Sequence, residues 1–172
     1  MPFSFVVEDG SGLEDATSYV SVADADTYYT IDANFTATWA ARTTTQKQHR
    51  LAWASRILDQ KVTWKGDKYV EESGLRWPRE GVYDRDGVEI ANDVVPLAVV
   101  QATLEFAKFL QENDPTEGSD VDWIEFLKMD VMEMRFQKGT SQTAFPSLLS
   151  DILRGVGVLA VGGPRFVKIV KV

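Results

Sequence analysis

The stretch of residues 72–87, ESGLRWPREGVYDRDG, brings basic and aromatic side chains close together in the sequence. Its arginines and aromatic residues are Arg76, Trp77, Arg79, Tyr83 and Arg85. Such interleaving is typical of surfaces that stack nucleic-acid bases while binding the phosphates. It is also typical of a rigid loop that a buried tryptophan pins to the core. The net charge of −8 and the pI of about 4.7 favour the loop, because nucleic-acid binders usually carry a positive footprint.

Few other residues have catalytic potential. His49 is the single histidine, and it stands between Gln48 and Arg50. One histidine on a helix supplies neither a nucleophile–base pair nor a cluster of metal ligands by itself. We therefore expect His49 to be an exposed helix residue.

Two pairs of acids, Asp24/Asp26 and Asp84/Asp86, are candidate metal ligands or acid–base pairs. Two residues on a helix that are two positions apart face different ways, which separates the first pair. The second pair imitates the start of a calcium loop, but the twelfth position is Val95 and not an acid. We interpret both pairs as cap and turn residues. The sequence thus predicts no catalytic residue, no metal and no cofactor, and the protein is expected not to be an enzyme.

The composition is that of an ordinary globular protein: 172 residues, 44% hydrophobic and 26% charged. Cysteine is absent, which excludes disulfides and thiolate metal sites. The N-terminal stretch MPFSFVVEDG lacks a basic region followed by a long apolar run, so we expect no signal peptide and synthesis in the cytosol. No apolar run reaches the roughly 18 residues of a membrane span.

Charge is distributed unevenly along the chain. Residues 111–133 contain eight acids and one base, whereas residues 134–172 contain six bases and one acid. An acidic segment followed by a basic one suits head-to-tail association between copies. Pairing of the two segments within one monomer is an equally good explanation, and the sequence leaves both open.

Periodicity and cap signals predict a mainly α fold with a few short β-strands, of the α+β class. A strand ending in a turn is expected over 4–12, and helices over 22–29, 44–59, 97–113 and 147–155. The segment 60–95 reads as irregular with a hairpin at 83–88, and the glycine-rich run 155–163 as a flexible connection. Residues 122–139 fit a helix early and a strand late, and residues 162–172 read as a strand. We expect a helical core domain over 1–112 and an assembly-engaged region over 113–172.

Several features recur in a fixed order: EDGSGLEDATSYVSVADADTYY at 8–29, Trp39, the helix QKQHRLAWASRILDQ at 46–60, WKG at 64–66, LRWPREG at 75–81 and Val95-Pro96 before an alanine-rich helix. Over about residues 7–112 this ordered set resembles a family of tailed-phage proteins. Such proteins are often labelled DnaT-like single-stranded-DNA-binding proteins, and they are also similar to head–tail connector proteins.

The resemblance implies a small helical bundle that acts as a head–tail adaptor in the virion neck, assembled in the host cytoplasm. The implied partners are other copies of the chain in a ring, commonly of twelve, the portal protein and a tail or neck completion protein. DNA would pass through the ring without sequence-specific binding, and no membrane is involved. The interface candidates are Trp64, Arg76, Trp77, Pro78, Arg79, Asp120, Asp122, Glu125, Arg154, Arg165, Lys168 and Lys171.

The alternative function is that of a DnaT-like protein which binds single-stranded DNA. In that case the contacts would come from the places where basic and aromatic residues interleave. These residues are Trp64, Lys65, Lys68, Arg76, Trp77 and Arg79.

Overall fold

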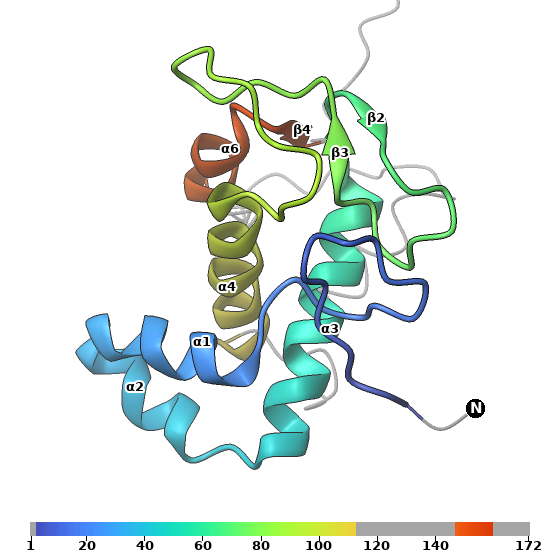
Figure 1. The fold of residues 1–172 in the computed structure, drawn as a ribbon. Helices are drawn as coiled ribbons and strands as arrows, with labels where there is room; N and C mark the ends of the chain where they lie inside the picture. The colour runs from blue at the N-terminus through green and yellow to red at the C-terminus, as the bar shows by residue number, and fades with distance from the viewer. Residues whose placement is uncertain (1–2, 113–146, 160–172) are drawn as a thin grey trace, which may run out of the picture.

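Two long helices, α3 (Thr44–Lys61) and α4 (Leu97–Glu112), lie side by side and form the centre of the fold. The computed structural model describes residues 3–112 and 147–159. Short helices cover one end of the central pair, and short strands and loops cover the other (Figure 1). The core between them is apolar and includes Leu51, Leu58, Phe106 and Leu110, all nearly inaccessible to solvent.

The first helical unit consists of α1 (Val22–Tyr28), a 3₁₀ turn (Tyr29–Ile31) and α2 (Ala33–Ala40). The Ser21 hydroxyl accepts the Asp24 amide 3.1 Å away and so forms the N-cap of α1. The Asp32 carboxylate caps α2 in the same way and begins a helix that the sequence reading missed. The Tyr29 hydroxyl donates to the Leu104 carbonyl at 2.6 Å, so this unit is joined to α4.

Helix α3 begins with a capping box. The Thr43 hydroxyl accepts the Gln46 amide, and the Gln46 side chain accepts the Thr43 amide at 2.9 Å. The predicted helix over 44–59 is confirmed, with two further residues at its end. Its apolar face includes Leu51, Ala54 and Leu58, which pack into the core towards α4.

The segment between α3 and α4 contains three short strands in the described structure: β1 (Val62–Trp64), β2 (Asp67–Lys68) and β3 (Arg79–Glu80). Strands β2 and β3 pair antiparallel with Asp67 opposite Glu80. The predicted turn at 83–88 is confirmed, with an isolated bridge between Tyr83 and Glu89. The predicted strand over 4–12 is only an isolated bridge, from Val7 to Ser18, although the turn that follows it is present.

After the undescribed stretch 113–146, helix α6 (Ser147–Leu153) packs against α4, and strand β4 (Gly157–Leu159) pairs antiparallel with β1. The helix following Pro146 is therefore confirmed. The glycine run 155–163 is not purely a connection, because residues 157–159 are a strand. Gly157 lies opposite Trp64, and a Cβ there would stand 2.6 Å from the Val62 side chain, so the pairing needs a glycine.

The predicted fold class is confirmed: five α-helices and two small antiparallel sheets make up residues 3–112 and 147–159. The expected elements over 122–139 and 162–172 lie outside the described residues. The predicted division into regions 1–112 and 113–172 stays a prediction.

Candidate nucleic-acid interface

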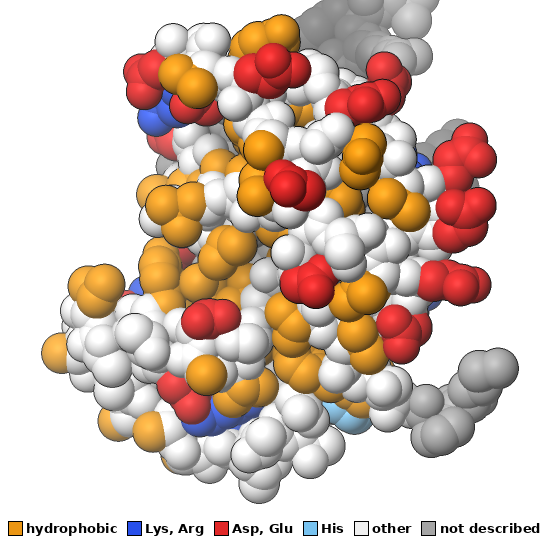
Figure 2. Space-filling view, viewed as in Figure 1, with side chains coloured by type: hydrophobic (Ala, Val, Ile, Leu, Met, Phe, Trp, Pro, Cys, Tyr) orange, Lys and Arg blue, Asp and Glu red, His pale blue; other side chains and the backbone are white. Residues whose placement is uncertain are grey.

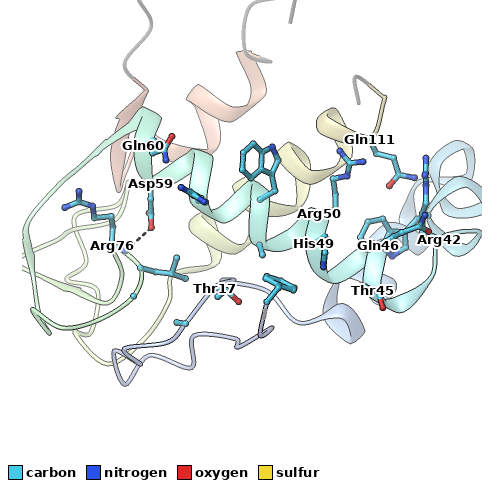
Figure 3. Close-up of a pocket in the computed structure, with 18 of the residues that line it drawn as sticks. Thr17, Arg42, Thr45, Gln46, His49, Arg50, Asp59, Gln60, Arg76 and Gln111 are labelled. Atoms are coloured by element: carbon cyan, nitrogen blue, oxygen red, sulfur yellow. Dashed lines mark hydrogen bonds between the residues drawn. The ribbon is translucent and has the colours of Figure 1, made fainter. Parts of the chain in front are cut away.

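A groove of about 1380 Å³ runs along α3 (Figure 3). One wall is the exposed side of α3. The other comes from the N-terminal segment, which contributes Phe3, Ala16 and Thr17, and from residues 68–76. Arg42 and Gln111 lie near one end of the groove, and Arg76 lies near the other, beside Asp59 (Figure 3).

The groove wall on α3 is a stripe of polar and aromatic side chains at spacings of three and four residues. Its members are Gln46, His49, Trp53, Arg56 and Gln60. This spacing places them on one face of the helix, off the face that carries the core residues. The helix therefore has a core face and a groove face.

Positive charge is concentrated along the groove. Five of the residues that line it are cations: Arg42, Arg50, Arg56, Lys68 and Arg76. The single acid among the described lining residues is Asp59. By contrast, Figure 2 shows a face on which carboxylates are scattered and basic side chains are few. Counted over its described lining residues, the groove thus has the opposite sign to the whole chain, whose net charge is −8.

Asp59 lines the groove, and its carboxylate accepts hydrogen bonds from three protein donors. It accepts the Tyr19 hydroxyl at 2.7 Å, the Trp64 indole N–H at 3.0 Å and the Arg76 amide at 3.0 Å. Burial raises the pKa of Asp59 above its ordinary value, although these donors act in the opposite direction. Burial and the neighbouring Asp59 charge raise the pKa of the Tyr19 hydroxyl well above its ordinary value.

This network attaches the 68–76 wall to α3. The Tyr19 hydroxyl also accepts the amides of Arg76 and Trp77, at 3.0 and 3.2 Å. The Lys68 ammonium donates to the carbonyls of Glu71 and Ser73, at 2.8 and 2.7 Å, and so folds the wall segment on itself.

Gly74 joins this wall to the N-terminal wall. Its amide donates to the Leu13 carbonyl at 2.9 Å. A Cβ at Gly74 would lie 2.6 Å from the Glu14 carbonyl oxygen and 2.7 Å from that of Ala16. Only a glycine permits such close approach, so the position of both walls depends on it.

The tryptophans of the predicted base-stacking surface are in the core. Trp77 is 0% exposed and Trp64 8% exposed, and their rings meet edge to face with centroids 6.0 Å apart. Pro78 is also buried, and the Trp77–Pro78 peptide bond is cis. The interpretation of residues 72–87 as a loop pinned to the core is therefore correct. The assignment of Trp64 and Trp77 to a DNA-stacking surface is wrong.

Arg76 and Arg79 of the same loop behave differently from each other. The Arg79 guanidinium donates to the carbonyls of Lys65, Gly66 and Arg76. Arg76 is exposed at the groove. Of the predicted basic contacts, Lys68 and Arg76 line the groove and Lys65 and Arg79 do not.

The predicted charged interface residues lie mostly beyond the described residues. This holds for Asp120, Asp122, Glu125, Arg165, Lys168 and Lys171. Arg154 is described and exposed, and it pairs with Asp151 at 3.4 Å.

Asp24 and the pair Asp84/Asp86 have the cap and turn roles that the sequence indicates, whereas Asp26 instead joins α1 to Trp39 and Lys47. Asp24 lies in the first turn of α1, while Asp26 accepts the Trp39 indole N–H at 2.7 Å and pairs with Lys47. The Asp84 carboxylate accepts the amides of Asp86 and Val88, each at 2.9 Å. Within residues 3–112 and 147–159 there is no group of three side chains that could hold a metal ion, and no helix that could cross a bilayer.

The sequence model of one protein family, described as "Putative DnaT-like ssDNA binding protein", matches residues 3–171. The chain belongs to this family. Comparisons with curated proteins and with solved structures give no match. Membership in the DnaT-like family thus extends the resemblance seen over residues 7–112 to nearly the whole chain.

The sequence reading missed most of the groove, including Trp53, Arg56 and Arg42. His49 is exposed, as predicted, but the prediction did not connect it with its neighbours. The sequence does contain a signal for the groove, which is the recurrence of polar and aromatic residues every three or four positions on α3. A stripe of His, Trp and Arg opposite an apolar stripe indicates a second functional face.

Proposed function

We propose that this DnaT-like protein binds single-stranded DNA, with the phosphate backbone lying along the groove beside α3. The observation that carries the proposal is the collection of five cations in one groove of an acidic protein. Phosphate neutralisation supplies most of the affinity of non-specific nucleic-acid binding, so the place where cations gather is the natural path for the backbone. The description of the family supports single-stranded DNA as the ligand.

The groove is suited to an extended polyanion. Helix α3 has 18 residues and is therefore about 27 Å long, and cations stand at intervals along it. Arg56 and Arg76 are exposed side chains at the groove, so their charge meets solvent and any ligand there. Against these five cations the described lining residues include one acid, Asp59, whose carboxylate accepts three hydrogen bonds from the protein.

A salt titration with a labelled oligothymidylate tests the proposal. Fluorescence anisotropy should give binding that weakens between about 50 and 200 mM salt. If all five cations replace counterions, the slope of log K against log salt is about −3.5, at about 0.7 per contact on a single strand. The double variant Arg56→Gln/Arg76→Gln should lower this slope by about 1.4.

Arg85→Gln/Arg154→Gln is the matched control, because it removes the same charge from exposed positions outside the groove. Its slope should equal that of the unchanged protein. An equal loss in both double variants would assign binding to overall charge and not to the groove. A protein that shows no salt-dependent affinity would contradict the proposal outright.

A second function, that of a head–tail connector subunit in a tailed-phage virion, is favoured by a different observation. The segment 83–97 exposes four large apolar side chains, among them Val88 at 61% and Leu97 at 68%. The other two are Tyr83 and Val94. Large apolar side chains exposed within one segment suit a protein interface, and a ring subunit needs such contacts with its neighbours or with the portal.

Native mass spectrometry separates the two functions. A connector subunit should form a closed ring with copies of itself, alone or after mixing with the portal protein. Leu97→Asp/Val88→Asp should block that assembly and leave oligothymidylate binding intact, because both positions are outside the groove. A chain that stays monomeric with the portal present would exclude the connector function.

A further inference from the structure

Trp53 differs from the other tryptophans that the structure describes. It is 39% exposed, whereas Trp39, Trp64 and Trp77 are all buried in the core. It lies in the groove, on the polar face of α3. Burial in the core therefore gives no reason for a tryptophan at this position.

His49 stands one helical turn before Trp53 on the same face. Four residues of α-helix rise about 6 Å, so the two residues are offset along the helix axis by nearly twice the 3.4 Å that separates stacked bases along a duplex strand. Phe3 packs edge-on against His49, with ring centroids 4.4 Å apart at 72°. This contact fixes the imidazole ring and adds a third aromatic surface to the groove.

A cation accompanies this aromatic pair. The guanidinium carbon of Arg56 lies 5.9 Å from the centre of the Trp53 ring, within the range of a cation–π contact. The contact restricts the indole and places a positive charge beside it. A nucleotide carries a flat base and an anionic phosphate, and the pair of Trp53 and Arg56 offers a partner for each.

We infer that Trp53 and the His49–Phe3 pair form a base-stacking subsite for two successive nucleotides of a single strand. This inference rests on the proposed function. Because the two surfaces are spaced more widely than stacked bases, only bases that have left their stack reach both of them. Duplex DNA keeps its bases paired and stacked, so the subsite selects single strands. The cations of the groove hold the backbone, and the rings recognise the flat faces of the bases without reading their identity.

An abasic ligand isolates the stacking contribution. An oligothymidylate and an abasic deoxyribose-phosphate strand of equal length carry the same charge, but only the first has bases to stack. Base stacking contributes about 1–3 kcal/mol per base, so Trp53→Ala should weaken oligothymidylate binding by about 5- to 150-fold. The same variant should bind the abasic strand as the unchanged protein does, and Trp53→Phe should restore much of the loss.

Tyr83→Ala is the matched control, since Tyr83 is an exposed aromatic outside the groove. It should leave both affinities unchanged. Equal affinity of Trp53→Ala and the unchanged protein for oligothymidylate would overturn the subsite while leaving groove binding intact. Loss of salt-dependent binding in the unchanged protein would instead overturn the proposed function itself.

The unchanged protein provides a second test that needs no substitution. It should prefer oligothymidylate to the abasic strand by the same factor that Trp53→Ala and His49→Ala remove together. Equal affinity for the two strands would overturn the stacking subsite even if a variant failed to fold.

Discussion

Replacing Asp59 with alanine tests whether the buried carboxylate holds the groove wall in place. The substitution removes the acceptor of three hydrogen bonds, from Tyr19, Trp64 and Arg76. The Arg76 amide retains the Tyr19 hydroxyl at 3.0 Å, but the buried Trp64 indole N–H loses its hydrogen-bond acceptor. A stranded buried donor costs about 1–3 kcal/mol, and the lost hydrogen bond to Tyr19 adds about 1 kcal/mol.

Removal of a desolvated charge offsets part of this loss, because burial disfavours the charged carboxylate. We therefore expect Asp59→Ala to lower the free energy of unfolding by about 2–3 kcal/mol. Urea unfolding followed by tryptophan fluorescence measures this value. Asp59→Asn, which keeps one carbonyl acceptor, should lose less than Asp59→Ala.

A double-mutant cycle with Tyr19→Phe separates the network from simple side-chain loss. Tyr19 and Asp59 share a hydrogen bond at 2.7 Å and a common partner in the Arg76 amide, so their effects should not add. A coupling energy of about 1 kcal/mol or more is expected. Additive single effects, or an unfolding free energy unchanged in Asp59→Ala, would refute the view that this carboxylate fastens the wall.

Three further substitutions or conditions test the fold and its electrostatics. Trp77→Ala should lower the free energy of unfolding by about 3–5 kcal/mol, since the ring is 0% exposed, and an unchanged thermal melt would contradict its role as the loop's anchor. Thr43→Ala removes the capping box of α3 and should lower stability by about 0.5–2 kcal/mol, whereas Thr43→Ser should be nearly neutral in the same urea titration. The Asp59 pKa is raised above 3.8 in the folded protein, so between these two values the folded state holds a proton that the unfolded chain has lost. The stabilising effect of Asp59 is therefore fully present below pH 3.8 and is lost as the pH rises through the raised pKa. Over this pH range, the free energy of unfolding of the unchanged protein should fall relative to that of Asp59→Asn. A difference between the two proteins that does not depend on pH would contradict the raised pKa of Asp59.

The helices were predictable where a cap and an apolar period coincide. Thr43 with Gln46 gives the start of α3, and Pro96 gives the start of α4, so both helices follow from local rules. Helix α2 escaped prediction because it is a short helix that follows directly on another, with Asp32 ending one and capping the next. Because Asp32 serves both helices, no loop residues separate them, and the sequence has no signal that marks where one ends and the next begins.

Strand β4 escaped prediction for a different reason. Glycine was interpreted as a sign of flexibility, whereas Gly157 is required because the Val62 side chain leaves no space for a Cβ. The pairing joins residues about 90 positions apart, and local sequence carries no information on that partner. The groove escaped prediction for the same reason. The Arg76 amide is held beside α3 by hydrogen bonds to Asp59 and Tyr19, which lie far from Arg76 in the sequence.

The net charge of −8 taken alone disfavours nucleic-acid binding, but a bound strand is affected mainly by the charges within one screening length of it. Charges on a protein surface are screened over about 8 Å at physiological ionic strength, so a strand in the groove is influenced mainly by the cations that line it. The carboxylates on the face shown in Figure 2 act over longer distances only when salt is dilute, since the screening length reaches about 30 Å at 0.01 M. At that ionic strength the whole acidic chain repels the DNA while the groove attracts it. Lowering the salt concentration should therefore strengthen binding, but each further reduction should add less affinity than the one before. The reason is that attraction by the groove and repulsion by the remaining surface grow together.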